Sequence, residues 1–292
     1  ILPYFLRKLE DLGYKNPVYK VVDMSYYGVP QSRRRFSLIA TRLENVNIHL
    51  PKADDKETVL ADYLGERNGF PKVSAGHKDS SVFNHTVAGL SDVCLKRLAK
   101  TKHDGGNRLD WANDPELQLP CFVGKDDCFK DTFGRMWWHR PASTITTKFY
   151  SISNGRFGHP EEDRALSLRE GATLQTFPKT YVFKTNSIAA TAKLIGNAVP
   201  CEYARRLGET IKALENNGLD MIFFMLTNIL TETTELICEG QGALQLAGKA
   251  FHQDIELLEE EGLKEPVLRL PGVVSRKKQL IPTLMNAMAE KV

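Results

Sequence analysis

Hydrophobic positions at the start of the chain repeat with the spacing of a helix. Leu2, Phe5, Leu6 and Leu9 stand at i, i+3, i+4 and i+7, and Gly13 follows them. In a helix this spacing gathers the four side chains on one face, and a glycine commonly ends such a helix. We therefore predict one amphipathic helix whose apolar face needs a partner surface.

Two runs of β-prone residues follow, at 18–24 and 36–41. The segment that joins them contains a glycine, a proline and then three successive arginines at 33–35. Short runs of this kind, bounded by turn residues, are typical of strands. The pattern predicts a strand, an exposed loop and a second strand.

Farther along, the pattern changes to an irregular region and then a short helix. Residues 45–135 are polar, weakly periodic and broken by glycine and proline, which favours loops and short elements. Ser167 and Glu170 then have the spacing of a capping box. We expect this box to open a short helix that ends before Pro178.

A longer helix is predicted around residue 207. Pro200 stands in its first turn and Gly218 lies beyond its end. Its apolar stripe has helical spacing and consists of Tyr203, Leu207, Ile211 and Leu214. Residues 219–292 mix an apolar opening with an acidic stretch at 259–261 and a basic stretch at 276–278, and we expect a mostly helical appendage there.

Composition excludes several classes of protein. Of 292 residues, 42% are hydrophobic, and 39 Lys and Arg stand against 36 Asp and Glu. This balance is typical of a globular protein and not of a disordered one. The net charge of +3 is too small to indicate nucleic-acid binding by itself. The longest apolar run, residues 221–226, falls far short of the roughly 20 residues that a bilayer span needs, so nothing indicates a membrane or export.

The cysteines indicate reduced thiols. There are 5 of them, an odd number, and no two form a Cys-x-x-Cys pair. This usage fits a cytoplasmic protein better than a disulfide framework or a zinc site. We expect no bound metal.

Three strings of residues resemble motifs of one enzyme family. Residues 27–35 contain Gln-Ser-Arg-Arg-Arg, residues 166–178 contain Leu-Ser-Leu-Arg-Glu-Gly, and residues 195–200 read Ile-Gly-Asn-Ala-Val-Pro. They resemble the Gln-x-Arg-x-Arg, ninth and tenth motifs of the DNA cytosine-5 methyltransferases, although Cys201 stands where a second proline is common. Three arginines alone would equally suit a solvated turn. Because the three strings come in the family's order, residues 1–214 are identified as part of a member.

The resemblance implies an α/β fold in which the end of a Rossmann-like methyltransferase domain is joined to a small, irregular α+β target-recognition domain. By the order of the motifs, residues 1–45 would end the catalytic domain and residues 46–190 would form the small domain. Residues 191–218 would return to the catalytic domain as the closing motif and helix. Residues 219–292 would be a helical extension of unknown role.

The resemblance also implies roles for the first string. An enzyme that methylates cytosine in DNA takes the base out of the duplex and holds it. By resemblance, Arg35 would contact the flipped cytosine, Arg33 would make phosphate or structural contacts, and Gln31 would support them.

The tenth-motif string would contact the cofactor. By resemblance, Gly196, Asn197, Ala198 and Val199 would lie at a helix N-terminus, where free N–H groups suit the carboxylate of S-adenosylmethionine. The N-terminus of an ordinary helix, with no role in ligand binding, would show the same pattern in the sequence.

Recognition of double-stranded DNA would fall to the interval between the motifs. Residues 102–108 form a glycine-bearing segment whose Lys102 and Arg108 could reach base edges or phosphates. Arg169 and Glu170 resemble the ninth-motif pair that organises the recognition region, although a capping box accounts for Glu170 equally well. We expect packing or loop roles for the remaining candidates, which are His77, His85, His103, Trp137 and Trp138.

The sequence lacks the strings that carry the family's nucleophile and cofactor loop. Methyl transfer to carbon 5 needs a thiolate that attacks carbon 6, and no Pro-Cys-Gln or Phe-x-Gly-x-Gly is present. Cys121 and Cys201 each follow a proline, but in the wrong context. We expect the C-terminal part of a restriction-modification methyltransferase, inactive without a missing N-terminal catalytic part or partner subunit. The alternative is a non-catalytic, sequence-specific DNA-binding or regulatory module.

The same expectation has a consequence for solubility. If the catalytic sheet is elsewhere, the apolar faces of the helices near residues 2–9 and 203–214 have no partner. Exposed apolar faces associate in water. We therefore expect poor solubility of the chain alone.

Overall fold

The computed structural model describes residues 2–42 and 47–215, together with the backbone of four short strands beyond them. Side chains are described up to residue 213. Contacts within the chain define two compact units. One comprises residues 1–22, 34–52 and 206–292, and the other comprises residues 23–33 and 53–205.

The first unit begins with the predicted amphipathic helix, α1 (Leu2–Asp11). The chain turns at Gly13, whose φ of 85° lies in the left-handed region that favours glycine. Phe5 and Leu9 are buried against Leu38 and Ala40. Each large apolar side chain buried in this way contributes about 1.5–3 kcal/mol. The helix is confirmed, but the expectation that its apolar face lacks a partner is wrong, because the second strand of the chain covers it.

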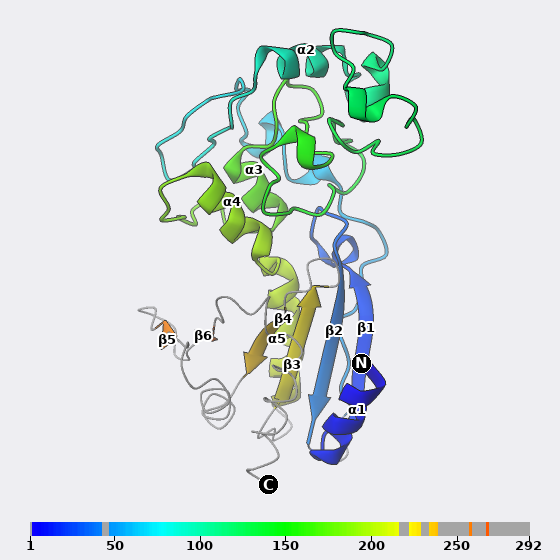
Figure 1. The fold of residues 1–292 in the computed structure, drawn as a ribbon. Coiled ribbons are helices and arrows are strands. Elements are labelled where there is room, and N and C mark those ends of the chain that lie inside the picture. The colour runs from blue at the N-terminus through cyan, green and yellow to red at the C-terminus, as the bar shows by residue number, and fades with distance from the viewer. Residues whose placement is uncertain are drawn as a thin grey trace. The chain divides into compact units, whose positions relative to one another are not determined.

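The sheet of this unit has the order β1-β2-β3-β4 (Figure 1). The two predicted strands are β1 (Lys15–Asp23) and β2 (Arg34–Thr41). β2 pairs antiparallel with β3 (Ile222–Asn228), in a register that runs from Arg35 opposite Asn228 to Thr41 opposite Ile222. β3 pairs antiparallel with β4 (Thr234–Cys238).

The described parts of residues 219–292 are therefore strands, and the prediction of a mostly helical segment is wrong for them. Two further short strands, β5 (Leu257–Leu258) and β6 (Val267–Leu268), pair with each other. Aromatic and β-branched residues favour strands, and β3 contains residues 222–226 of the apolar run noted in the sequence. The acidic stretch 259–261 and the basic stretch 276–278 lie outside the described residues.

The second unit is built mainly from loops and helices. Its α-helices are α2 (Asp92–Lys100), α3 (Leu168–Leu174), α4 (Ile188–Asn197) and the start of α5 (Cys201–Glu215). Six 3₁₀ turns join them, at Met24–Tyr27, Leu60–Asp62, Glu66–Asn68, Arg108–Trp111, Pro120–Phe122 and Ile152–Asn154. Within residues 53–205 the β-structure consists of isolated bridges, so the irregular region is confirmed and the β part of the expected α+β domain is minimal.

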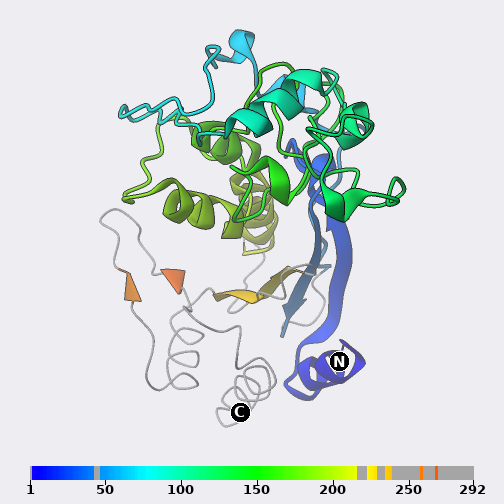
Figure 2. The ribbon, with the colours of Figure 1, turned by 45° about the horizontal axis from the view of Figure 1, so that its top comes forward.

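The core of this unit lies around α3. All seven residues of α3 are buried, and α4 lies beside it (Figures 1 and 2). Gly171 allows the Phe149 ring to pack directly against α3, since a Cβ atom at residue 171 would lie 2.2 Å from that ring. The buried core residues are Leu60, Leu64, Phe70, Met136, Ala142, Ile145, Phe149, Phe157, Leu166, Leu168, Ala172, Leu174, Ala192 and Ile195.

The long helix near the end is confirmed as α5, with Pro200 just before it. Tyr203, Leu207 and Ile211 are buried, while the Leu214 side chain lies outside the described residues. The described residues of the apolar stripe are thus covered, and poor solubility of the chain alone stays a prediction. Among the described helices, none combines the length and apolar character needed to cross a bilayer.

Candidate functional site

Residues 24–33, which contain Gln31 and Arg33 of the first motif, form a largely buried loop. Asp23 closes it, since one carboxylate oxygen accepts the N–H of Arg33 at 3.1 Å and the other accepts the Ser32 hydroxyl at 2.9 Å. Gln31 and Arg33 are buried, and Ser32 is exposed. The prediction of an exposed loop is wrong, because the loop's long polar side chains bond to distant carbonyl groups instead of water.

Gln31 joins the loop to the end of α3. Its Nε2 donates to the Leu174 carbonyl at 2.7 Å and to Oε1 of Gln175 at 2.9 Å. Its Oε1 accepts the N–H of Ile145 at 3.0 Å. The amide uses both donors and an acceptor while it is fully buried, so it fixes three separate segments against one another.

Arg33 lies at the C-terminal end of α4. Its Nη1 donates to the Ile145 carbonyl at 2.9 Å, and its Nη2 donates to the carbonyls of Gly196 at 3.3 Å and Ala198 at 3.4 Å. The last carbonyls of a helix lack partners within the helix, and a positive charge is favourable there. Of the two roles expected for Arg33, the structure contains the structural contacts, and a phosphate contact stays a prediction.

Arg35 lies in β2, in the other unit. Its side chain is buried, and its Nη1 donates to the carbonyl of Arg34 at 2.8 Å. Contact between Arg35 and a flipped cytosine stays a prediction.

The tenth-motif string occupies a different position from the one expected. Gly196 and Asn197 end α4, and Ala198 is its C-cap, so the expected helix N-terminus is wrong for these residues. The N–H of Ala198 is bonded to the Ile195 carbonyl at 3.2 Å. α5 begins only at Cys201. The groups that 196–198 present are mainly carbonyls at a helix C-terminus, which suit cations and not carboxylates.

The same turn still offers one polar side chain to a ligand. Asn197 is exposed, whereas Gly196 is buried against the backbone of Thr146. A carboxamide can donate and accept hydrogen bonds, so Asn197 suits the amino and carboxylate groups of a cofactor such as S-adenosylmethionine. Asn197 is thus the exposed polar side chain of this turn, and contact between residues 196–199 and a cofactor stays a prediction.

The ninth-motif helix is held by its predicted capping box. The Ser167 hydroxyl accepts the N–H of Glu170 at 3.0 Å, and the Glu170 carboxylate accepts the N–H of Ser167 at 2.7 Å. The same hydroxyl lies 2.8 Å from Nδ1 of His85. His85 has a packing role, as expected, and its burial lowers its pKa.

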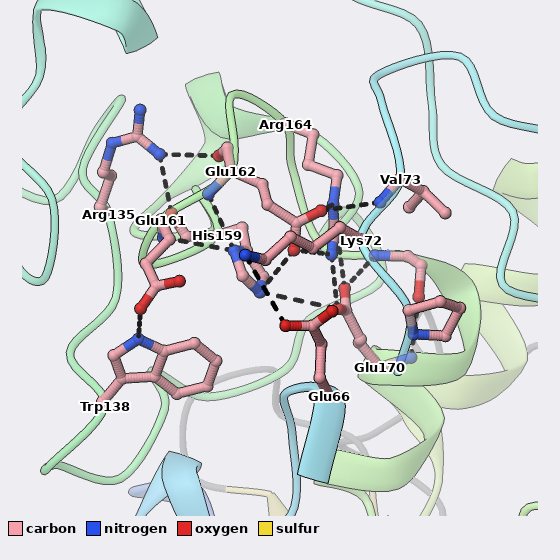
Figure 3. Close-up of polar contacts among 12 residues, drawn as sticks. Glu66, Lys72, Val73, Arg135, Trp138, His159, Glu161, Glu162, Arg164 and Glu170 are labelled. Carbon is pink, nitrogen blue, oxygen red and sulfur yellow. Dashed lines mark hydrogen bonds and ion pairs between the residues drawn. The ribbon is translucent and has the colours of Figure 1, made fainter. Parts of the chain in front are cut away.

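Glu170 also belongs to a buried cluster of charges with Arg164, Glu162 and His159 (Figure 3). Burial alone would raise the pKa of Glu170, but the neighbouring Arg164 lowers it to about 2. Burial would lower the pKa of Arg164, but Glu170 more than compensates and raises it. Both groups therefore stay charged inside the unit.

His159 is the neutral member of this cluster. Its Nδ1 accepts the N–H groups of Glu161 at 3.3 Å and Glu162 at 3.0 Å, so the proton lies on Nε2, which is 3.3 Å from Oε1 of Glu162. Burial lowers its pKa to about 4, although Glu170 opposes the shift.

A cavity of about 350 Å³ is lined in part by His159. Glu66 and Lys72, which lie 3.7 Å apart, stand at its exposed side. Glu162, which lines it next to His159, already accepts from Arg164 and from the N–H of Val73 at 2.8 Å. The polar groups deepest in the cavity are thus committed to bonds within the protein.

Arg169 is a buried residue of α3 itself. It donates to four main-chain carbonyls, those of Phe83, Pro178, Val82 and Tyr181. These contacts agree with the expected organising role. A direct contact with DNA stays a prediction, and it would need the guanidinium to leave these partners.

The two recognition candidates differ in exposure. The side chain of Lys102 is 83% exposed, and its Nζ lies 4.0 Å from Asp110. Arg108 is buried and donates to the carbonyls of Lys125, Cys128 and Phe129. Lys102 is therefore accessible to a binding partner. Arg108 instead stabilises the loop at residues 125–129.

The tryptophans pack as expected, with one difference. Trp138 packs at the edge of the core and donates to Glu161 at 2.9 Å. Trp137 is contacted by the guanidinium groups of Arg140, at 4.7 Å from the ring centre, and of Arg156, at 4.1 Å. Trp137 is thus a partner of arginines and not a core residue.

Sequence reasoning missed several buried arginines. Arg135 donates to the carbonyls of Thr101, His159, Glu162 and Leu98, and Arg156 donates to those of Gly105, Gly106, Arg135 and Lys130. Both precede the ninth-motif string at 166–178, and this position is the sequence signal for them. Their burial depends on carbonyls far away in the sequence.

The four cysteines whose side chains are described are free thiols, namely Cys94, Cys121, Cys128 and Cys201. Burial raises the pKa of Cys201, which disfavours its thiolate. Within the described residues, no group of three metal-ligating side chains is gathered.

Profiles of known protein families match two overlapping parts of the sequence. The profile of the C-5 cytosine-specific DNA methylases matches residues 1–213, so the chain belongs to this family. A second profile, the DHHA2 domain, matches residues 188–287.

Two curated relatives are type II enzymes. The type II methylase M.HgiDII of Herpetosiphon aurantiacus is 36% identical over 213 residues, which are 71% of this chain and 58% of the relative. The type II methyltransferase M1.HphI of Haemophilus parahaemolyticus is 32% identical over 211 residues, which are 72% of this chain and 51% of the relative. The chain thus spans little more than half the length of these relatives.

A solved structure supports the fold. A protein described as a DNA modification methyltransferase encoded within an E. coli prophage has a TM-score of 0.51 and 17% identity, and the match covers 74% of this chain and 65% of that one. The fold is that of an α/β methyltransferase.

Proposed function

We propose that this chain is the recognition part of a DNA cytosine-5 methyltransferase, which binds double-stranded DNA and presents Arg35 to a flipped cytosine. The observation that carries this proposal is the family match over residues 1–213, in a sequence with no Pro-Cys-Gln string. The nucleophile and most of the site for S-adenosylmethionine then come from a further part of the enzyme, either the same polypeptide or a partner subunit.

The described residues of the chain supply binding and orientation. The cofactor, when bound, supplies the methyl group. Asn197 is the side chain of the tenth motif that can bind the cofactor's polar end, and Gln31 and Arg33 hold the loop that leads to Arg35. Lys102 provides an exposed positive charge for a phosphate.

The first experiment measures binding of the full chain to fluorescent duplex DNA at several salt concentrations. We expect binding that weakens with salt, because phosphate contacts release counterions. Lys102→Ala should lower the slope of log K against log salt by about 1. Lys96→Ala, at another exposed lysine, is the matched control. Absence of DNA binding by the full chain would overturn the proposal.

The second experiment tests whether this chain carries the cysteine that attacks the cytosine. Duplex DNA with a fluorinated target cytosine traps the attacking cysteine of this reaction covalently. We expect no adduct with the chain alone, and methyl transfer only after addition of a methylase part that bears Pro-Cys-Gln. An adduct at Cys121 or Cys201 would contradict the proposal. DNA binding without transfer in any mixture would favour a non-catalytic DNA-binding or regulatory module.

A further inference from the structure

The chain leaves α3 through a strained residue, Thr176. Its φ of 60° lies in the left-handed region, which side chains branched at Cβ rarely adopt. Among the non-glycine residues of the described chain with positive φ, Thr176 is the one with a β-branched side chain. Strain of this kind persists only where surrounding contacts enforce it, and it is often found at functional sites.

The contacts that enforce it belong to the start of α5. The Thr176 hydroxyl accepts the N–H of Glu202 at 2.9 Å and donates to the Gln175 carbonyl at 2.7 Å. The Gln175 carbonyl also accepts the N–H of Cys201 at 3.1 Å. The first N–H groups of a helix have no partner within it, so Gln175 and Thr176 cap α5 from outside.

The side chain of Gln175 holds the end of α4. Its Nε2 donates to the carbonyls of Ile195 at 2.7 Å and Ala198 at 3.2 Å. Its Oε1 accepts from Gln31, which fixes the orientation of the amide. Two adjacent residues thus hold both sides of the short turn between α4 and α5.

We propose that Gln175 and Thr176 are positioning residues, which fix the turn at 198–200 and so set where the exposed Asn197 side chain meets the cofactor. This inference rests on the proposed function. A glycine would adopt the φ of residue 176 without strain. The Thr176 hydroxyl adds the acceptor for the N–H of Glu202, which glycine lacks, and this bond accompanies the strained φ.

The test uses the full chain with Thr176→Gly and Thr176→Ser, and measures amide hydrogen exchange together with thermal unfolding. Thr176→Gly relieves the strain and removes the acceptor. We expect exchange at Glu202 to accelerate by about tenfold, the order expected for one lost hydrogen bond, while the melting temperature is kept or raised. Thr176→Ser keeps the acceptor and should keep the protection. Asn84→Gly, at another position of positive φ, should leave Glu202 unchanged.

A second readout separates positioning from a merely structural role. In enzyme completed with the Pro-Cys-Gln part, Thr176→Gly should raise the KM for S-adenosylmethionine about tenfold and leave the KM for DNA unchanged, and Thr176→Ser should restore the wild-type value. Unchanged exchange at Glu202, or faster exchange with an unchanged cofactor KM, would overturn the inference. Failure of the wild-type chain to bind DNA would instead count against the proposed function, since the exchange measurement does not depend on DNA.

Discussion

Arg164 and Glu170 form a bidentate ion pair, in which Nη1 donates to Oε2 at 2.7 Å and Nη2 donates to Oε1 at 2.8 Å. Both side chains are buried, and Glu170 stands in the first turn of α3. The pair therefore ties the segment before the helix to the helix itself. Parallel bonds between guanidinium and carboxylate are the strongest geometry available to such a pair.

Removing one charge of this pair should lower the free energy of unfolding. Glu170→Gln leaves the Arg164 charge buried with less compensation, and breaking a buried pair in this way costs about 3–5 kcal/mol. Urea denaturation of the variant should show a loss of that size. Asp11→Asn breaks the exposed pair with Lys8, at 3.3 Å, and should cost less than about 1 kcal/mol. Equal losses in the two variants would contradict this account.

Stability should also fall in mild acid because of His159. Its pKa of about 4 in the folded chain lies below the ordinary value of 6.5, so the unfolded chain takes up a proton first. The contribution of neutral His159 to the free energy of unfolding is fully present above pH 6.5 and is lost as the pH falls toward 4. Between pH 7 and pH 5 the loss should be about 2 kcal/mol.

Denaturation of the wild type and His159→Gln at the two pH values tests this. The variant starts less stable but should lose less between them, because glutamine does not titrate. His85, whose pKa is also lowered by burial, leaves a residual slope in both proteins. Glu170 adds little in this window, because its folded pKa of about 2 and its ordinary pKa of 4.5 both lie below pH 5. Identical slopes in the two proteins would show that another group is responsible.

Local patterns in the sequence were sufficient for several elements. The spacing from Leu2 to Leu9 gave α1, and Ser167 with Glu170 gave the start of α3. These signals act within one or two turns of the chain, where periodicity and capping decide the outcome. α4 was not predicted, although Ser187 accepts the N–H of Ala190 at 3.1 Å as its N-cap. The pattern at 195–200 indicated the start of a helix at the point where α4 ends.

The environment of the motif arginines could not be predicted in this way. Arg33 bonds to Ile145 and Gly196, which are 112 and 163 positions away. A charged residue before a strand is normally solvated, and only the folded chain shows the carbonyls that replace water. The motifs therefore identified the family, but the contacts within the unit required the structure.

Two glycines in helices should respond to alanine in opposite ways. Gly171→Ala in α3 places a Cβ atom 2.2 Å from the Phe149 ring in a packed core, and overpacking of this kind costs about 1–3 kcal/mol. Gly208→Ala in α5 meets no atom within 4 Å. Alanine is the better helix former by about 0.5–1 kcal/mol, so this variant should be more stable. Thermal unfolding of both would check the pair, and a stabilised Gly171→Ala would contradict the described packing.

Arg33 offers a direct comparison between a structural and a DNA-contacting role. Arg33→Ala removes the donor from the carbonyls of Ile145 and Gly196, and loss of such charged bonds should cost about 2–3 kcal/mol of unfolding free energy. Arg34→Ala, at the exposed neighbour, should change stability by less than about 0.5 kcal/mol. Because the Arg33 guanidinium is committed to carbonyls, the salt slope of DNA binding should stay at its wild-type value. A slope lowered by about 1 with stability intact would instead assign Arg33 to a phosphate.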